Sequence, residues 1–297
     1  MGSQDIIITP DGQSPAWKIP PGSPPLEDMR AFMTACETGS GEDVIAYLRR
    51  WPAFPEIKWD NIETTSLMLA ARHGHDTVVK LLIDAGCPLH TQDADGNTAL
   101  FCALVEGRLS TVKLLLDEGA DLSLRPNLGQ TALARAVYSG NEALVRFLFE
   151  KGEKADTRDK DGYTPLFQLR WCVDEENNLA PLLVQHGADV NAQTANGLSP
   201  LGEVVTDGRV KTVRQLLDLG ADLNVTALHM PLLQAAKTVR NGEEIYKMLE
   251  EEPLRRERAA QAVIDAAREE IRARDAEIDA AVHNGVRVKP MRLRLKL

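Results

Sequence analysis

The sequence has few aromatic side chains and no long apolar run. Aromatic residues make up 5% of the 297 residues, too few to suggest a surface on which nucleic-acid bases stack. No stretch approaches the roughly 20 apolar residues that a membrane helix needs. The start, MGSQDIIITPDG, lacks the basic residues and the apolar core of a secretory signal. We therefore expect a soluble, cytoplasmic protein that binds neither nucleic acid nor a membrane.

Cysteines and catalytic motifs are also scarce. The four cysteines are scattered without a C-x-x-C pair, which favours reduced thiols in a cytosol. The sequence has no H-E-x-x-H, G-x-S-x-G, P-loop or dinucleotide-binding glycine pattern. The aspartate-rich stretches 93–98 and 159–164 lack the glycine and glutamate spacing of a calcium loop. His73 and His75 are two residues apart and do not share a helix face. We expect no catalytic residue, cofactor or metal.

Charge is distributed unevenly along the chain. Residues 253–297 contain 11 basic and 7 acidic residues, a net charge of +4. The totals of 34 and 44 leave 23 and 37 for residues 1–252, a net charge of −14. An acidic surface argues against nucleic acid and favours a protein partner with a basic surface. The alternative is that the acidity only keeps the protein soluble.

The sequence does contain a repeat with a period of 33 residues. Its copies enter at a hydroxyl residue, with spacings of 33, 33, 33 and 35: Thr65, Thr98, Thr131, Thr164 and Ser199. Each copy predicts a turn, a short helix that ends at a glycine, and a second helix that also ends at a glycine. Two such helices cannot bury their apolar faces alone, so stacked copies must share a core.

The segments DGNTAL, DGYTPL, AARHGH, HGADVN and LGADLN resemble the ankyrin repeat. The resemblance is strong over about residues 60–229, and 32–48 and 230–249 look like divergent first and last copies. It implies an all-α solenoid of stacked helix-turn-helix units with β-turn tips over residues 26–252. The family often has histidine after the leucine of its T-P-L-H motif. The absence of that histidine predicts lower local stability, and the residues in its place are Met68, Phe101, Ala134, Phe167 and Gly202.

In this family, the turn tips and the exposed side of each first helix form a concave binding face. The resemblance therefore implies partner-binding residues at the matching positions of this chain. At the turn tips they are Asn97, Leu128, Tyr163 and Leu198, and on the first helices they are Arg72, Glu106, Tyr138, Trp171 and Asp207. Tyrosine and tryptophan are favoured at binding hot spots because they bury much area at little entropic cost. The alternative for each residue is that it packs against its own repeat. This alternative interpretation is strong for Trp171, next to the two-residue insertion, and weak for Tyr163, at a turn tip.

The two ends differ from the repeats. Six prolines between residues 9 and 25 predict that residues 1–25 form an extended arm. Residues 253–285 predict a long helix, in which isoleucines recur every seven residues at 264, 271 and 278. A helix that caps the last repeat is favoured there over dimerisation through residues 255–282. Residues 286–297 alternate apolar and basic side chains, which predicts a strand. This strand would pair with DIIIT (5–9), add to a partner's sheet, or remain a solvated end.

These patterns favour a non-enzymatic protein that binds a protein partner on its concave face. The alanine- and arginine-rich composition of residues 255–281 points to a bacterial source. An inhibitor, such as an immunity protein that neutralises a toxin, is one interpretation. The alternatives are a secreted host-targeting effector and a scaffold that oligomerises through the C-terminal helix.

Overall fold

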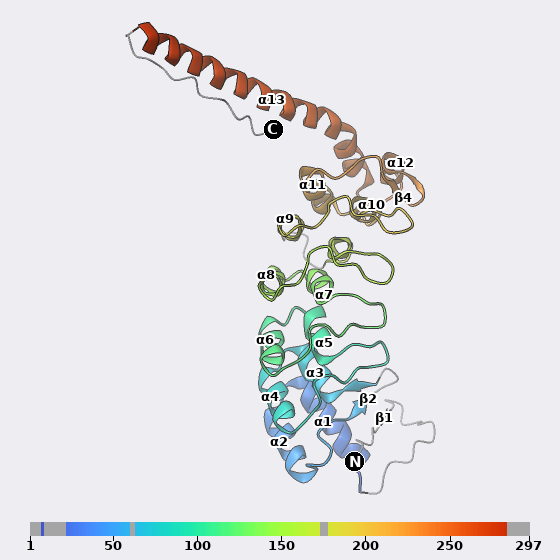
Figure 1. The fold of residues 1–297 in the computed structure, drawn as a ribbon. Coiled ribbons are helices and arrows are strands. Elements are labelled where there is room, and N and C mark those ends of the chain that lie inside the picture. Colours follow the sequence, from blue (N-terminus) through green and yellow to red (C-terminus); the bar gives the residue numbers. More distant parts are fainter. Residues whose placement is uncertain (1–6, 9–21, 60–62, 173–177, 284–297) are drawn as a thin grey trace. The chain divides into compact units, whose positions relative to one another are not determined.

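The computed structural model describes residues 7–8, 22–59, 63–172 and 178–283. The chain divides into two compact units, Met1–Ile245 and Tyr246–Leu297. Helices follow one another in pairs along the first unit (Figure 1). The helices are α1 (Leu26–Thr38), α2 (Gly41–Arg50), α3 (Ser66–His73), α4 (Asp76–Asp84), α5 (Ala99–Val105), α6 (Leu109–Asp117), α7 (Ala132–Ser139), α8 (Glu142–Glu150), the 3₁₀ helix η1 (Pro165–Arg170), α9 (Leu179–Gln185), α10 (Pro200–Thr206), α11 (Val210–Asp218), α12 (Leu232–Ala236) and α13 (Gly242–His283).

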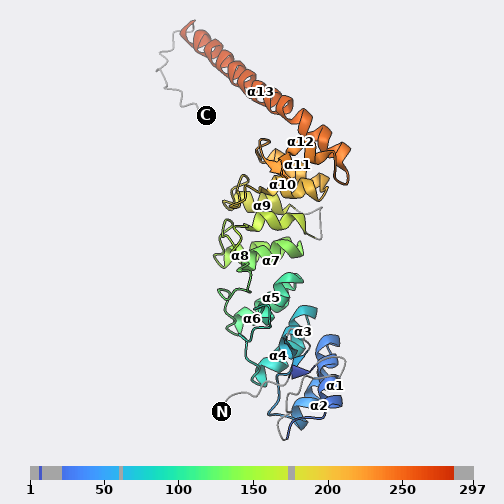
Figure 2. The same ribbon diagram turned by 90° about the vertical axis from the view of Figure 1, so that its right-hand side faces the viewer.

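The first helix of each pair contacts the first helix of the next. These contacts run from α1 through α3, α5, α7, η1 and α10 to α12. We call these the inner helices and the second helix of each pair the outer helix. Outer helices contact each other from α2 through α4 to α6, and α9 contacts α11. Figure 2 shows the same succession from the side. The arrangement confirms the expected solenoid of stacked helix-turn-helix units.

Equivalent leucines form the shared core. The leucine two residues after each repeat's entry hydroxyl is at most 1% exposed, at Leu67, Leu100, Leu133, Leu166 and Leu201. Apolar residues at helical spacing on the outer helices, such as Leu82, Leu115 and Leu148, are fully buried as well. Each repeat therefore buries its apolar face against its neighbours, which is the packing that one repeat alone cannot provide.

The entry hydroxyls cap the inner helices. Their side-chain oxygens accept a hydrogen bond from the backbone N–H three residues later at Thr65, Thr98, Thr131 and Ser199. At Thr65 the sulfur of Met68 also accepts a bond from the Thr65 backbone N–H. Met68 therefore partly replaces the polar link that the missing histidine would make.

A side chain just before the outer helices α4, α6, α8, α11 and α13 links each of them to the preceding repeat. His75 Nε2 lies 2.8 Å from the carbonyl oxygen of Glu37, and Asn141 Nδ2 donates to the Gly107 carbonyl over the same distance. Equivalent bonds join Arg108 to the Arg72 carbonyl, Arg209 to that of Cys172 and Asn241 to that of Gly208. These bonds use carbonyls at the C-terminal ends of the inner helices, which lack intrahelical partners. His75 therefore has a structural role.

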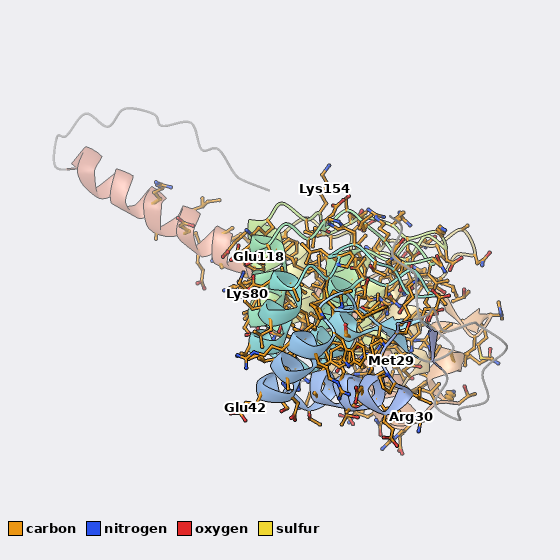
Figure 3. All side chains as sticks on the ribbon, turned by 90° about the horizontal axis from the view of Figure 1, so that it is seen from below. Met29, Arg30, Glu42, Lys80, Glu118 and Lys154 are labelled. Carbon is orange, nitrogen blue, oxygen red and sulfur yellow. The ribbon has the colours of Figure 1, made fainter. Side chains whose placement is uncertain are left out.

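The N-terminal end of the first unit presents polar side chains. Figure 3 looks along the repeats from this end, with Arg30 and Glu42 pointing away from the ribbon and Met29 inside. Met29 is fully buried, whereas Arg30 and Glu42 are exposed. Such a polar outer surface is what a terminal repeat needs, because one of its faces meets water. Figure 3 also shows Lys80 beside Glu118, which are joined by an ion pair of 2.9 Å between successive outer segments.

Two small sheets flank the helices. Strand β1 (Ile7–Ile8) pairs in parallel with β2 (Lys58–Trp59), which pairs antiparallel with β3 (Thr64–Thr65). Strand β4 (Thr226–Ala227) pairs antiparallel with β5 (Met230–Pro231). Ile7–Ile8 thus pairs with the second repeat of the same chain. One expectation from the sequence was that this segment would pair with the C-terminal strand. Residues 1–6 and 9–21 of the predicted arm and the strand predicted over 286–297 lie outside the described residues.

The long C-terminal helix begins earlier than expected. Helix α13 starts at Gly242 and passes through Pro253, whereas the sequence suggested a start after this proline. Ile245, Met248 and Leu249 are buried and share a helical spacing, so their burial offsets the backbone hydrogen bond that Pro253 cannot donate. In the described part of the chain, no helix combines the length and apolarity needed to span a membrane.

Candidate binding face

The nine residues expected on the concave face differ in exposure. Leu128, Trp171 and Glu106 are exposed, with Leu128 57% and Trp171 44% accessible. The other six are half-buried: Arg72, Asn97, Tyr138, Tyr163, Leu198 and Asp207. Exposed large apolar side chains are the more informative ones, because an uncovered tryptophan contributes most when a partner buries it.

The turn tips are held by aspartate side chains. Asp93 Oδ1 accepts bonds from the backbone N–H groups of Asp95 and Asn97, at 3.0 and 2.8 Å. Asp159 makes the same pair of bonds to Asp161 and Tyr163. The carboxylates of both aspartate-rich stretches therefore form the repeat's turns. Neighbouring tips are joined as well, since the Asn127 backbone N–H donates to the Asp95 carbonyl at 2.8 Å.

The fifth repeat is irregular. Its inner helix η1 is a 3₁₀ helix, whereas its neighbours α7 and α10 are α-helices. In the tighter turn the Phe167 N–H donates to the backbone carbonyl of Thr164, at 3.0 Å. The buried Thr164 hydroxyl consequently has no hydrogen-bond partner in the described part of the chain. The inner helix of the fifth repeat is therefore wound more tightly than those of its neighbours.

Arg170, at the end of η1, is fixed by two carboxylates of the next repeat. Its guanidinium donates two hydrogen bonds of 3.0 Å to Asp207 and also pairs with Glu203. The Glu203 side chain is 8% exposed, so it is a nearly buried charge that this arginine compensates. The Arg170 guanidinium carbon lies 4.6 Å from the ring centroid of Trp171. This cation–π contact holds an exposed tryptophan in place.

The two tyrosines have different surroundings. Tyr163 packs edge-on against the buried Phe167, with 5.1 Å between ring centroids. Tyr138 lies near Arg135, whose pKa is lowered by burial and partly restored by Tyr138 and Cys102. Arg135 Nε has no hydrogen-bond partner within the described residues. Tyr138 thus lies beside an arginine whose Nε lacks a hydrogen bond, whereas Tyr163 packs against its own repeat.

All four cysteines are buried thiols that form no disulfide among the described residues. Burial raises the pKa of the Cys102 thiol to about 11, although the nearby Arg72 opposes this shift. At neutral pH the thiol is therefore protonated and a poor nucleophile. Cys36 and Cys102 are thus core residues.

The family model for ankyrin repeats, in three copies, matches residues 32–126 and 124–194. These matches cover more than half of the chain. The chain belongs to the ankyrin repeat family. A search of curated proteins gave no match. Ankyrin repeats are protein–protein interaction modules, and this is the class of function that the family indicates.

The chain is also similar to a solved ankyrin structure. The ankyrin repeat domain of Bcl-3, described as a unique member of the IkappaB protein family, shares 29% sequence identity with it. The match has a TM-score of 0.53 and covers 74% of this chain and 97% of that one. The ankyrin repeats of this chain therefore account for most of its length.

Sequence reasoning missed the support around Trp171. It named Trp171 and Asp207 but not Arg170 or Glu203, which connect them. These residues lie one repeat apart, so their spacing of 33 to 37 positions carries no local pattern. A signal was present in their charge, because a basic residue at one repeat position faces acidic residues near the same position of the next copy.

Proposed function

We propose that this ankyrin protein binds a protein partner through its concave face, with Trp171 as the central anchor. The observation that carries the proposal is that Trp171 is 44% exposed yet held by Arg170, which two carboxylates fix in turn. A partner that buries this ring gains apolar contact without having to order the side chain. Leu128, which is 57% exposed at a turn tip, supplies a second apolar contact on the same face.

Acidic side chains form the polar part of this proposed face. Glu106, from the nine expected residues, is exposed, and so are Asp95 and Asp161 at two other turn tips. These acidic groups, and the net charge of −14 over residues 1–252, suit a partner with a basic surface. The function that fits best is inhibition: the chain covers the basic surface of a partner, as an immunity protein covers a toxin. The exposed apolar residues of α13 favour an oligomerising scaffold as the second candidate.

The proposal is tested by comparing one face variant with one control. The chain, Trp171→Ala and Lys80→Ala are each used as bait in extracts of the cells that produce the protein. Lys80 lies on outer helix α4, away from the turn tips, and serves as the control. We expect a protein that is enriched on the wild type and on Lys80→Ala and is lost from Trp171→Ala. Titration of that purified partner should then show at least about tenfold weaker binding by Trp171→Ala.

Salt dependence tests the charge of the partner. Raising ionic strength should slow association with the wild-type chain, because exposed charges are screened beyond about 10 Å at 0.1 M salt. A salt-independent association rate would remove the basic partner from the proposal.

The comparison of the two variants has its own contradicting outcome. If Trp171→Ala binds the partner as well as the wild type does, and Lys80→Ala does not bind it, the site lies on the outer helices.

A further inference from the structure

Helix α13 carries apolar side chains that face water. Beyond Pro253, exposed fractions reach 50% at Leu254, 70% at Val263, 47% at Ile264 and 38% at Ile271. An isolated helix gains little stability from its own hydrogen bonds, and most helical stability in proteins comes from packing of an apolar face. These side chains therefore suggest a surface that another helix covers.

The apolar residues follow a heptad pattern. Ala260, Ile264, Ala267 and Ile271 are separated by four, three and four residues, which places them on one stripe of the helix. The two isoleucines occupy a positions of the heptad and the two alanines occupy d positions. The next a position toward the N-terminus is Glu257, and the next d position toward the C-terminus is Arg274. An acidic and a basic residue, about 26 Å apart along the helix, thus bound a short apolar seam.

We propose that residues 257–274 pair with the same segment of a second copy of this chain, in antiparallel orientation. With the two-fold axis between residues 265 and 266, Glu257 of one helix lies opposite Arg274 of the other. In the same alignment Ile264 lies opposite Ala267, and Ala260 lies opposite Ile271. Every apolar layer then joins one large and one small side chain, and both seam charges meet an opposite charge.

Two other alignments of two copies bring like charges together. In a parallel, in-register pair the two Glu257 residues face each other, and so do the two Arg274 residues. An antiparallel pair shifted by one heptad toward the C-terminus places Arg268 against Arg268 and Glu270 against Glu270. Like charges in such positions disfavour an alignment, because they specify partner and orientation in coiled coils. The seam is therefore complementary to itself in the antiparallel alignment.

The dimer would be modest in affinity. Each helix contributes two isoleucines and two alanines to the seam, far less than the interface of an obligate dimer. Its consequence is a second binding face on the same assembly, which raises avidity toward a partner with repeated sites. This inference concerns α13 and stands independently of the concave face.

Charge exchange on the full-length chain tests both the dimer and its orientation. We expect sedimentation velocity over a wide concentration range to show a monomer–dimer equilibrium for the wild type. Glu257→Arg and Arg274→Glu should each raise the dimer Kd by about tenfold, because each turns two opposite-charge contacts into like-charge contacts. The double variant should restore the wild-type Kd. Glu269→Arg, which makes the same charge change on the outward side of the helix, should leave the Kd unchanged.

Several outcomes would overturn the proposal. One is a wild-type chain that stays monomeric at the highest concentration reached. A second is a dimer that persists in Ile264→Asp, which would place the interface elsewhere. A third is a double variant that does not regain the affinity lost by the single variants. This would contradict the antiparallel alignment, because in a parallel pair the charge exchange creates no opposite-charge contact. Circular dichroism and thermal unfolding of each variant confirm that its helices and repeats remain folded.

Discussion

Arg170 donates two hydrogen bonds of 3.0 Å to the carboxylate of Asp207, which follows 37 residues later. This fork joins the irregular fifth repeat to the sixth and positions the guanidinium against Trp171. The same arginine neutralises Glu203, a nearly buried carboxylate. One residue therefore supports both the repeat interface and the exposed ring of the proposed binding face.

Replacement of Arg170 by alanine should destabilise the protein. Without the guanidinium, the Glu203 carboxylate is left nearly buried and unpaired, and we expect a loss of about 2–3 kcal/mol in the free energy of unfolding. Urea unfolding followed by circular dichroism measures this change. Arg146→Ala is the matched control: its ion pair with Glu142 is exposed, so it should change stability by less than about 0.5 kcal/mol. Equal effects of the two variants would contradict the role assigned to Arg170.

Two threonines at equivalent positions should respond oppositely to valine. The Thr131 hydroxyl accepts a bond of 3.0 Å from the Ala134 N–H, so Thr131→Val should cost about 1 kcal/mol. The buried Thr164 hydroxyl has no such bond in the described part of the chain. Thr164→Val should therefore leave stability unchanged or raise it by up to about 1 kcal/mol. Thermal and urea unfolding of both variants decide this, and a clear loss in Thr164→Val would show that its hydroxyl is satisfied.

Asn141 should contribute both a helix cap and a link between repeats. Its Oδ1 accepts from the Leu144 N–H and its Nδ2 donates to the Gly107 carbonyl. Asn141→Ala loses both bonds and should cost about 2 kcal/mol. Asn141→Asp keeps the acceptor but lacks the donor, and should cost roughly half as much. If both variants are equally unstable in urea, the cap contributes nothing and the link alone matters.

Glu153 should make stability depend on pH. Burial raises its pKa, although Arg125 and a backbone hydrogen bond partly oppose this shift. Because the folded chain holds this proton more tightly than the unfolded chain, Glu153 favours folding in acid. This contribution is lost as the pH rises through the folded pKa. Glu153→Gln should therefore be more stable than the wild type at pH 7, with a smaller difference at pH 4. A difference that grows toward acid would contradict the raised pKa.

Local signals in the sequence were sufficient for the repeat architecture. The hydroxyl entry residues, the leucine that follows them and the closing glycines each predict a feature of one repeat. Their period of 33 residues then requires stacking, since two short helices cannot bury their apolar faces alone. The nine candidate partner-binding residues came from matching positions to the family, and whether a partner contacts them stays a prediction.

Tertiary structure decided the features that join one repeat to another. The Arg170 fork to Asp207 and the bond from Asn141 to the Gly107 carbonyl depend on how neighbouring copies dock. The orphaned Thr164 hydroxyl follows from the 3₁₀ turn of η1. The start of α13 at Gly242 likewise went against the local signal of Pro253. The physical reason is that hydroxyl caps and glycine stops act within a few residues of the backbone. By contrast, a side chain that spans two repeats meets a partner more than 30 positions away, and its geometry exists only after the repeats have packed.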